Sequence, residues 1–217
     1  MRIYYSLLTL IILLASCNNN QQQKEAEKNA TTDEQVSKEI PRNQILSNEQ
    51  QIAAAIIAAP KKAREEAKVY GYDTEGKLIV LREGSNEFIC IADNPEKDGF
   101  QIVSYHTSLE PIMARGRALG KEGKSRKEKE ETRSSEAKSG ILKLPESPAT
   151  LHIYYGKDGY FDTKNDSIIN AKYRYVVYIP YATQATTGLP LSPNVSSHPW
   201  LMFPGKYNAH IMITPTE

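Results

Sequence analysis

The stretch that most constrains the fold covers residues 78–119, which combine strand-like runs, dense turns and the start of a helix. Within it, residues 87–92 alternate, so that Cys90 lies on one face of the predicted strand and Ile89 and Ile91 lie on the other. Both faces are therefore apolar, which is typical of a strand that is covered on both sides. A chain with this segment is expected to bury a sheet between other elements.

Local signals place further elements around this segment. Ser47 and Gln50 form a possible capping box before an apolar run, which predicts a helix at residues 48–59. A second helix is predicted to begin near Ser108, because Pro111 would then lie in the first helical turn. Strands are predicted at residues 67–72, 78–82, 87–92, 100–105, 151–155, 173–181 and 206–213.

These elements predict a single α+β domain at residues 45–217, with a largely antiparallel sheet and two packed helices. The first four strands are expected to follow one another as a meander, because short turns separate them. Residues 156–170 are expected to form a polar loop and residues 182–197 to be irregular. The charged segment at about 121–140 is almost without apolar residues, so we expect a solvated helical arm or a disordered loop there.

The N-terminus carries the signals of export. Residues 1–16 are predicted to be a signal peptide, because Arg2 precedes an apolar run that is too short to span a bilayer comfortably. The ending at Cys17 resembles the lipobox of bacterial lipoproteins, which implies acylation of Cys17 and anchoring in a membrane. The alternative is a general secretory site with an incidental cysteine. Residues 17–44, rich in Asn, Gln, Lys and Glu, are expected to form a disordered tether.

Composition narrows the classes of function. The formal net charge of +1 gives no reason to expect binding to nucleic acid. The chain has 13 tyrosines and 4 phenylalanines, which indicates either ordinary strand tyrosines or a surface that faces a sugar or a peptide. Phosphate-loop, G-x-S-x-G and H-E-x-x-H motifs are absent from the sequence, so those enzyme classes lack their usual signal. No cofactor is expected.

A site of histidines and carboxylates is the main catalytic hypothesis. Its candidate residues are His106, Glu110, Glu83 and His210. Their spacing contains no H-x-x-x-H pair, so only tertiary folding could bring them to one metal ion or one hydrolytic centre. The alternative is that they are satisfied polar groups at strand ends. Cys90 is either a reactive thiol in an oxidising compartment or a buried structural cysteine.

Two further groups are candidates for a binding surface. Arg82, Arg115 and Arg117 could form an anion pocket, or could pair with Glu83 and so lock a helix to the first hairpin. The second group is apolar and consists of Trp200, Met202 and Phe203. Two flanking prolines are expected to prevent regular structure there. The segment is then either an exposed loop that grips a ligand or partner, or a plug that seals one end of the sheet.

Several motifs together resemble an uncharacterised family of secreted bacterial proteins. They are LREGSN with the F and C that follow it (81–90), PIMARGR (111–117), HPWLMFPG (198–205) and HIM (210–212). The resemblance covers most of residues 48–217 and implies no activity, substrate or cofactor. Many members of this family have a second cysteine where Ser104 stands here. The resemblance thus implies that a strand-to-strand disulfide from Cys90 is missing and that its thiol is free.

The sequence therefore predicts a lipoprotein of the bacterial cell envelope, at the outer membrane or facing the periplasm. The leading hypothesis for its function is a non-enzymatic binding or structural module. The alternative is a small metal-dependent or hydrolytic envelope enzyme that uses the histidine and carboxylate site. Expected partners are the membrane, through the lipid anchor, and an envelope protein or a small ligand.

Overall fold

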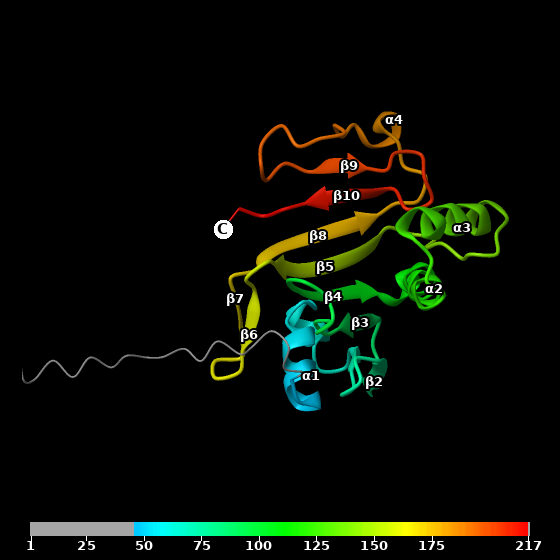
Figure 1. Cartoon of the computed structure of the whole chain (residues 1–217). Coiled ribbons are helices and arrows are strands. Elements are labelled where there is room, and N and C mark those ends of the chain that lie inside the picture. The colour runs from blue at the N-terminus through cyan, green and yellow to red at the C-terminus, as the bar shows by residue number, and fades with distance from the viewer. Residues whose placement is uncertain (1–45, 217) are drawn as a thin grey trace, which may run out of the picture. The chain divides into compact units, whose positions relative to one another are not determined.

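The computed structural model describes residues 46–216, which contain an eight-stranded sheet with the order β2-β1-β3-β4-β5-β8-β10-β9 (Figure 1). The strands of this sheet are β1 Lys68–Tyr72, β2 Leu78–Arg82, β3 Phe88–Ile91, β4 Phe100–His106, β5 Ala149–Gly156, β8 Lys172–Tyr178, β9 Trp200–Met202 and β10 His210–Ile213. A separate hairpin consists of β6 Tyr160–Asp162 and β7 Ser167–Ile169. The helices are α1 Asn48–Ile56, α2 Glu110–Lys121, α3 Arg126–Lys138 and α4 Gln184–Thr187, with short helical turns η1 Lys61–Ala63 and η2 Thr107–Leu109.

The predicted α+β class and the largely antiparallel sheet are confirmed. The meander is wrong at its third strand, because β3 pairs with β1 in parallel and leaves β2 at the edge. The cause lies in residues 83–87. The backbone N–H groups of Ser85 and Asn86 donate to the carbonyl of Glu66, and the Asn86 side chain donates to the carbonyl of Ala63. These bonds hold residues 83–87 across the start of β1, so that β3 pairs with β1 on the side opposite β2.

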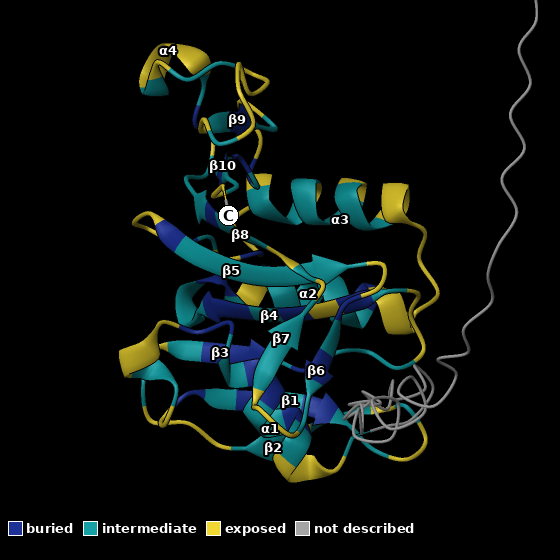
Figure 2. Cartoon of the chain, turned by 90° about the vertical axis from the view of Figure 1, so that its left-hand side faces the viewer, coloured by how far each residue is buried: buried dark blue, intermediate teal, exposed yellow. Residues whose placement is uncertain are grey.

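Alternation along β4 separates the two faces of the sheet. Phe100 and Ile102 pack with Ala54 of α1, whereas Tyr105 packs with Leu109 and Ile112 at the start of α2. Because neighbouring strand residues point to opposite faces, α1 and α2 cover different sides of the sheet. Figure 2 shows that buried residues, in dark blue, lie along β3 and β4 in the middle of the sheet.

Helix α1 begins at the predicted capping box. The Ser47 hydroxyl accepts from the backbone N–H of Gln50, and the Gln50 side chain accepts from the backbone N–H of Ser47. Gln51 in the first turn is buried, and its amide both donates to the carbonyl of Tyr72 (2.9 Å) and accepts from the N–H of Tyr72 (2.8 Å). This pair of bonds fixes α1 against the end of β1, where an apolar side chain would leave the strand's backbone unpaired.

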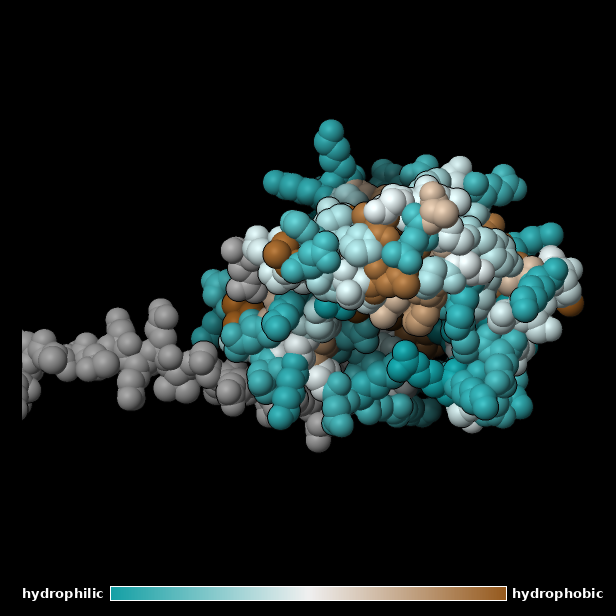
Figure 3. Space-filling view, turned by 90° about the horizontal axis from the view of Figure 1, so that it is seen from above, coloured by the Kyte–Doolittle hydropathy of each residue, from teal (hydrophilic) through white to brown (hydrophobic). Residues whose placement is uncertain are grey.

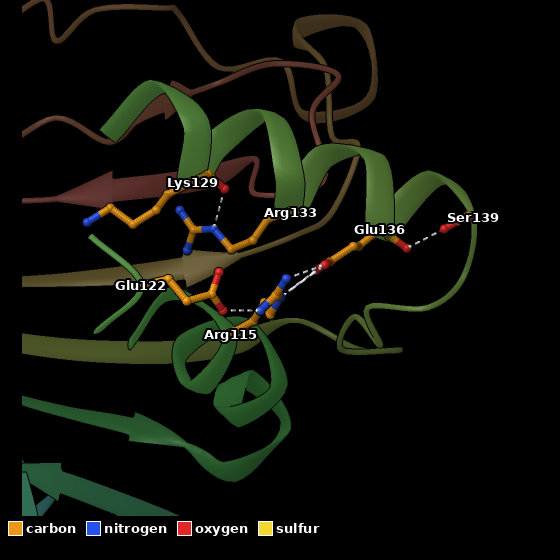
Figure 4. Close-up of polar contacts among 6 residues, drawn as sticks. All are labelled: Arg115, Glu122, Lys129, Arg133, Glu136 and Ser139. Carbon is orange, nitrogen blue, oxygen red and sulfur yellow. Dashed lines mark hydrogen bonds and ion pairs between the residues drawn. The ribbon is translucent and has the colours of Figure 1, made fainter. Parts of the chain in front are cut away.

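The charged segment at about 121–140 contains helix α3, which confirms the helical alternative of the prediction. The helix is not a free arm, however, because it contacts the rest of the fold. Figure 4 shows the guanidinium of Arg115 on α2 against the carboxylate of Glu136 on α3, with Nη2–Oε1 at 2.7 Å and Nε–Oε2 at 2.9 Å. Glu130 accepts from the hydroxyl of Tyr207, at 3.0 Å. No residue of α3 is buried. Polar contacts and the packing of a single small side chain, Ala137, therefore hold this helix in place, which a search for an apolar face could not detect.

Two segments expected to be irregular contain strands. Pro199 and Pro204 flank β9, which pairs with β10 at the edge of the sheet. The prediction that these prolines prevent regular structure is wrong, because a proline just outside a strand removes no ladder hydrogen bond. The predicted loop at residues 156–170 contains the hairpin β6–β7, and Phe161 of β6 packs with Phe100.

Four hydrophobic clusters form the core of the described segment, with members from Leu46 to Ala209. Within residues 46–216, none of the helices combines the length and apolarity needed to cross a membrane. The predicted signal peptide at 1–16, the predicted acylation of Cys17 and the predicted tether at 17–44 lie outside the described residues.

Candidate binding surface

The four candidates for a histidine and carboxylate site lie apart. Glu83 follows β2 at one edge of the sheet, His106 ends β4, Glu110 begins α2, and His210 begins β10. Strands β4 and β10 are separated by β5 and β8. Within the part of the chain that the structure describes, no three His, Cys, Asp or Glu side chains are grouped closely enough to hold a metal ion. The predicted convergence does not occur.

Each of these residues has a local partner instead, which for His210 is the carbonyl of Asn208, 2.8 Å from its Nδ1. The Lys68 ammonium lies 2.9 Å from Glu83 Oε2, and His106 Nδ1 lies 2.8 Å from the hydroxyl of Ser108. Glu110 accepts from the hydroxyl of Tyr105, at 2.6 Å, and Arg117 also lies on this carboxylate. Burial and the bond to Glu110 raise the pKa of Tyr105, so its phenol stays protonated and keeps donating. Glu110 thus joins β4 to α2.

The predicted cluster of Arg82, Arg115 and Arg117 around Glu83 is not formed. Arg82 donates to the carbonyl of Ala67 through Nε (3.0 Å) and Nη2 (2.9 Å), within its own hairpin. Arg115 binds the carboxylate of α3 described above, and Arg117 binds that of α2. The three arginines therefore make separate structural contacts, and they leave neither an anion pocket nor an arginine pair with Glu83 among the residues described.

The apolar segment at Trp200, Met202 and Phe203 lies at the β9 edge, where all three side chains are partly exposed. The Phe203 ring meets the His210 ring edge-on, with centroids 5.6 Å apart. Leu201, between Trp200 and Met202, is buried in a small apolar cluster. The segment therefore combines a buried residue, as expected of the plug, with partly exposed residues, as expected of the loop. Figure 3, seen from the side of this edge, shows apolar surface gathered among polar groups.

Of the two alternatives for Cys90, a reactive thiol or a buried structural cysteine, the structure shows the second. Its side chain is fully buried, and its Sγ lies 3.5 Å from the hydroxyl of Ser104, its partner across β3 and β4. Burial raises the pKa of the Cys90 thiol, which disfavours the nucleophilic thiolate.

We expect the Cys90 thiol to resist an aromatic disulfide reagent in the folded protein and to react fully in denaturant. The chain from residue 18 onward is suitable, because it lacks the other cysteine. A Ser139→Cys variant, with its thiol at an exposed helix end, is the positive control and should react within seconds to minutes. Equal labelling rates for Cys90 and for the cysteine at 139 would contradict the burial described here.

Aromatic side chains gather on the face that carries α1, beyond the strands that α1 covers. His152 and Tyr154 on β5 lie opposite Tyr175 and Tyr173 on β8. Helix α1 packs against β1 to β4, and of these four side chains only Tyr154 packs against the cluster that α1 forms with Phe100 and Phe161. All four are partly exposed. We call His152, Tyr154, Tyr173 and Tyr175 the aromatic face.

The rings of the aromatic face are arranged side by side. His152 lies nearly parallel to Tyr173 and Tyr175, with interplanar angles of 18° and 26° and centroids 6.2 and 6.1 Å away. Tyr154 is closer to Tyr173, at 4.9 Å. Parallel rings about 6 Å apart are offset rather than face to face, so neither covers the other completely. His152 Nδ1 lies 2.6 Å from the Tyr173 hydroxyl, which fixes both side chains.

The aromatic face is electrically neutral. Burial lowers the pKa of His152, so its imidazole is uncharged near neutral pH, and burial raises the pKa of Tyr173. None of the ion pairs among residues 46–216 involves the four side chains. The surface therefore offers ring faces and neutral hydroxyl and imidazole groups.

Protonation of His152 and His210 should destabilise the protein. Burial lowers the pKa of both below the ordinary value of 6.5. Just below that value the unfolded chain binds more protons than the folded protein, so the free energy of unfolding falls as pH falls. We expect this loss to begin as the pH falls through the ordinary histidine value of 6.5 and to grow as the pH falls further. Urea titrations at a series of pH values measure it. His152→Gln should reduce the loss, and a flat profile would contradict the burial of both imidazoles.

His152 and its three partners were not among the site residues predicted from the sequence. A signal was present, since His152 and Tyr154 are two residues apart, as are Tyr173 and Tyr175, and such pairs share one face of a strand. The pairing of β5 with β8 was not predictable, because the sequence does not show how the chain runs between Gly156 and Lys172. Only the register brings the four rings together.

Comparisons of this chain with protein-family models, curated proteins and solved structures found no match.

Proposed function

We propose that this protein is a non-enzymatic binding module of the bacterial cell envelope, and that the aromatic face binds a neutral carbohydrate chain. The observation that carries the proposal is a group of four partly exposed, uncharged rings on one face of β5 and β8, two of which, His152 and Tyr173, are held together by a hydrogen bond. The predicted acylation of Cys17 would hold the module at a membrane, and the predicted tether would let it reach its ligand.

The chemistry of the aromatic face suits a sugar better than a charged polymer. A pyranose ring has an apolar face of C–H groups that packs on aromatic rings, and hydroxyl groups around its edge that exchange hydrogen bonds with phenols and imidazoles. Nucleic acid would require cations along the surface, and the aromatic face has none. Fixed side chains lose little conformational entropy on binding, which favours recognition by rings over recognition by long flexible side chains.

The proposal is tested with short neutral oligosaccharides, namely oligomers of glucose and of N-acetylglucosamine, by calorimetry on the chain from residue 18 onward. We expect Tyr175→Ala to weaken binding about fivefold or more, equivalent to about 1 kcal/mol for one lost ring. Tyr173→Phe keeps the ring but removes the hydroxyl that holds His152, so its loss should be smaller.

Tyr181→Ala is the matched control, because Tyr181 is an exposed tyrosine that lies outside the aromatic face. It should leave binding unchanged. The proposal fails if no oligosaccharide binds, or if the control variant weakens binding as much as Tyr175→Ala does.

A further inference from the structure

A cleft of about 600 Å³ lies on the face of the sheet opposite the aromatic face. Alternation along β5 separates the two sites, since Leu151, Ile153 and Tyr155 line the cleft while His152 and Tyr154 point to the other side. The volume falls within the range of small-molecule sites, which is roughly 300–1,000 Å³. The cleft is thus a separate place where a ligand could bind.

The floor of the cleft is apolar. Leu151 and Ile153 of β5, Val176 of β8 and Met212 of β10 form it. Val176 and Met212 are only 5% and 7% exposed, whereas Leu151 and Ile153 are partly exposed and are open to a ligand. An aliphatic chain along this floor would remove further apolar surface from water, at about 25 cal/mol per Å².

One end of the cleft is cationic. The Arg174 guanidinium lies over the Tyr155 ring, 4.9 Å from its centroid, and its Nε donates to the hydroxyl of Thr214 at 2.9 Å. Lys157 lines the same end, together with Asp98. In the described part of the chain, no carboxylate forms an ion pair with Arg174.

Among the described residues, the side-chain hydrogen bond of Arg174 uses Nε, so a ligand would meet its two Nη groups. The stacking on Tyr155 and the bond from Nε hold the guanidinium plane in place, so the planar fork is preorganised. A carboxylate matches such a fork with two parallel hydrogen bonds. Among the residues that line the cleft, Arg174 and Lys157 outnumber Asp98, which favours an anionic group.

We propose that this cleft binds a free long-chain carboxylate, with the acid group on Arg174 and the aliphatic chain along Leu151, Ile153 and Met212. The apolar floor and the cationic end together select this ligand: a neutral alcohol would leave the guanidinium unused, and a small anion would leave the floor uncovered. The proposal does not depend on carbohydrate binding at the aromatic face.

The test uses decanoate, decanol and inorganic phosphate as probes on the chain from residue 18 onward, followed by calorimetry. We expect decanoate to bind about tenfold or more tightly than decanol, the difference that a charge-assisted bidentate contact supplies. Arg174→Gln should lower the affinity for decanoate about tenfold and leave that for decanol unchanged. Phosphate should bind more weakly than decanoate, because it gains nothing from the floor.

Two further variants keep the test decisive if Arg174→Gln does not fold. Arg174→Lys retains the charge but not the fork, and Lys157→Gln removes the second cation from an exposed position. Both should weaken decanoate binding by a smaller factor. Lys164→Gln, in the β6–β7 turn outside the cleft, is the control and should have no effect. The proposal is overturned if decanol binds as tightly as decanoate or if decanoate does not bind. It is also overturned if Lys157→Gln and Lys164→Gln have the same effect on the affinity for decanoate.

Discussion

Replacing Gly84 by alanine is expected to destabilise the fold severely. A Cβ atom at this position would lie 2.2 Å from the backbone N of Lys68 and 2.7 Å from the carbonyl oxygen of Glu66. These are backbone atoms at the start of β1, and hydrogen bonds from Ser85 and Asn86 hold that backbone in place. The clash cannot be relieved by turning a side chain, so we expect a loss of about 3 kcal/mol or more. Urea denaturation followed by circular dichroism measures it.

Gly120→Ala is the matched control for this change. Gly120 lies in α2, and the nearest atom to its added Cβ is the Lys129 Nζ, at 4.0 Å. Alanine is the better helix former by about 0.8–1.0 kcal/mol, so this variant should be neutral or slightly stabilised. If Gly84→Ala unfolds at the same urea concentration as the wild type, the close crossing of residues 83–87 over β1 is incorrect.

Replacing Ser104 by cysteine is expected to create a disulfide with Cys90 and to stabilise the protein. The two residues are direct partners across antiparallel β3 and β4, and their side-chain ends lie 3.5 Å apart. Such partners have Cα atoms about 4.5–5.5 Å apart, within the range of about 4.4–6.8 Å that a disulfide tolerates. Closing a loop of about 15 residues should raise the free energy of unfolding by about 3 kcal/mol.

This gain should disappear in reductant, which separates the effect of the bond from that of the new side chain. Ser104→Ala is the second control, since it removes the hydroxyl beside the Cys90 thiol without adding a sulfur atom. Thiol counting under denaturing conditions should find no free thiol in the oxidised Ser104→Cys chain from residue 18 onward. Two free thiols after air oxidation would contradict the pairing of positions 90 and 104.

The sequence predicted those parts of the fold that depend on near neighbours in the chain. The capping box at Ser47 and Gln50 gave the start of α1, and the turn between β1 and β2 gave the first hairpin. The parallel pairing of β3 was not predictable, because it depends on side-chain and backbone bonds from Asn86 to residues 20 or more positions earlier. The docking of α3 was missed for a similar reason, since its ion pair between Arg115 and Glu136 is not an apolar pattern.

The candidate sites also depend on contacts between distant parts of the chain, which the sequence does not specify. Residue type alone suggested His106, Glu110, Glu83 and His210, but each of them is satisfied by a partner nearby in space and lies apart from the others. The aromatic face and the cleft both depend on the register of β5 and β8, which places Tyr154 beside Tyr173 on one side and Ile153 beside Arg174 on the other. Register over so long a connection is a tertiary property, and period-two alternation alone does not specify it.

Proton and nitrogen-15 NMR on the chain from residue 18 onward, titrated with neutral oligosaccharides, tests the proposed function most directly. If the aromatic face binds carbohydrate, the ring resonances of His152, Tyr154, Tyr173 and Tyr175 should shift together with one dissociation constant, while those of Tyr181 stay in place. If the four rings do not respond to any sugar, or if shifts appear only at residues elsewhere in the fold, the aromatic face is not a carbohydrate site.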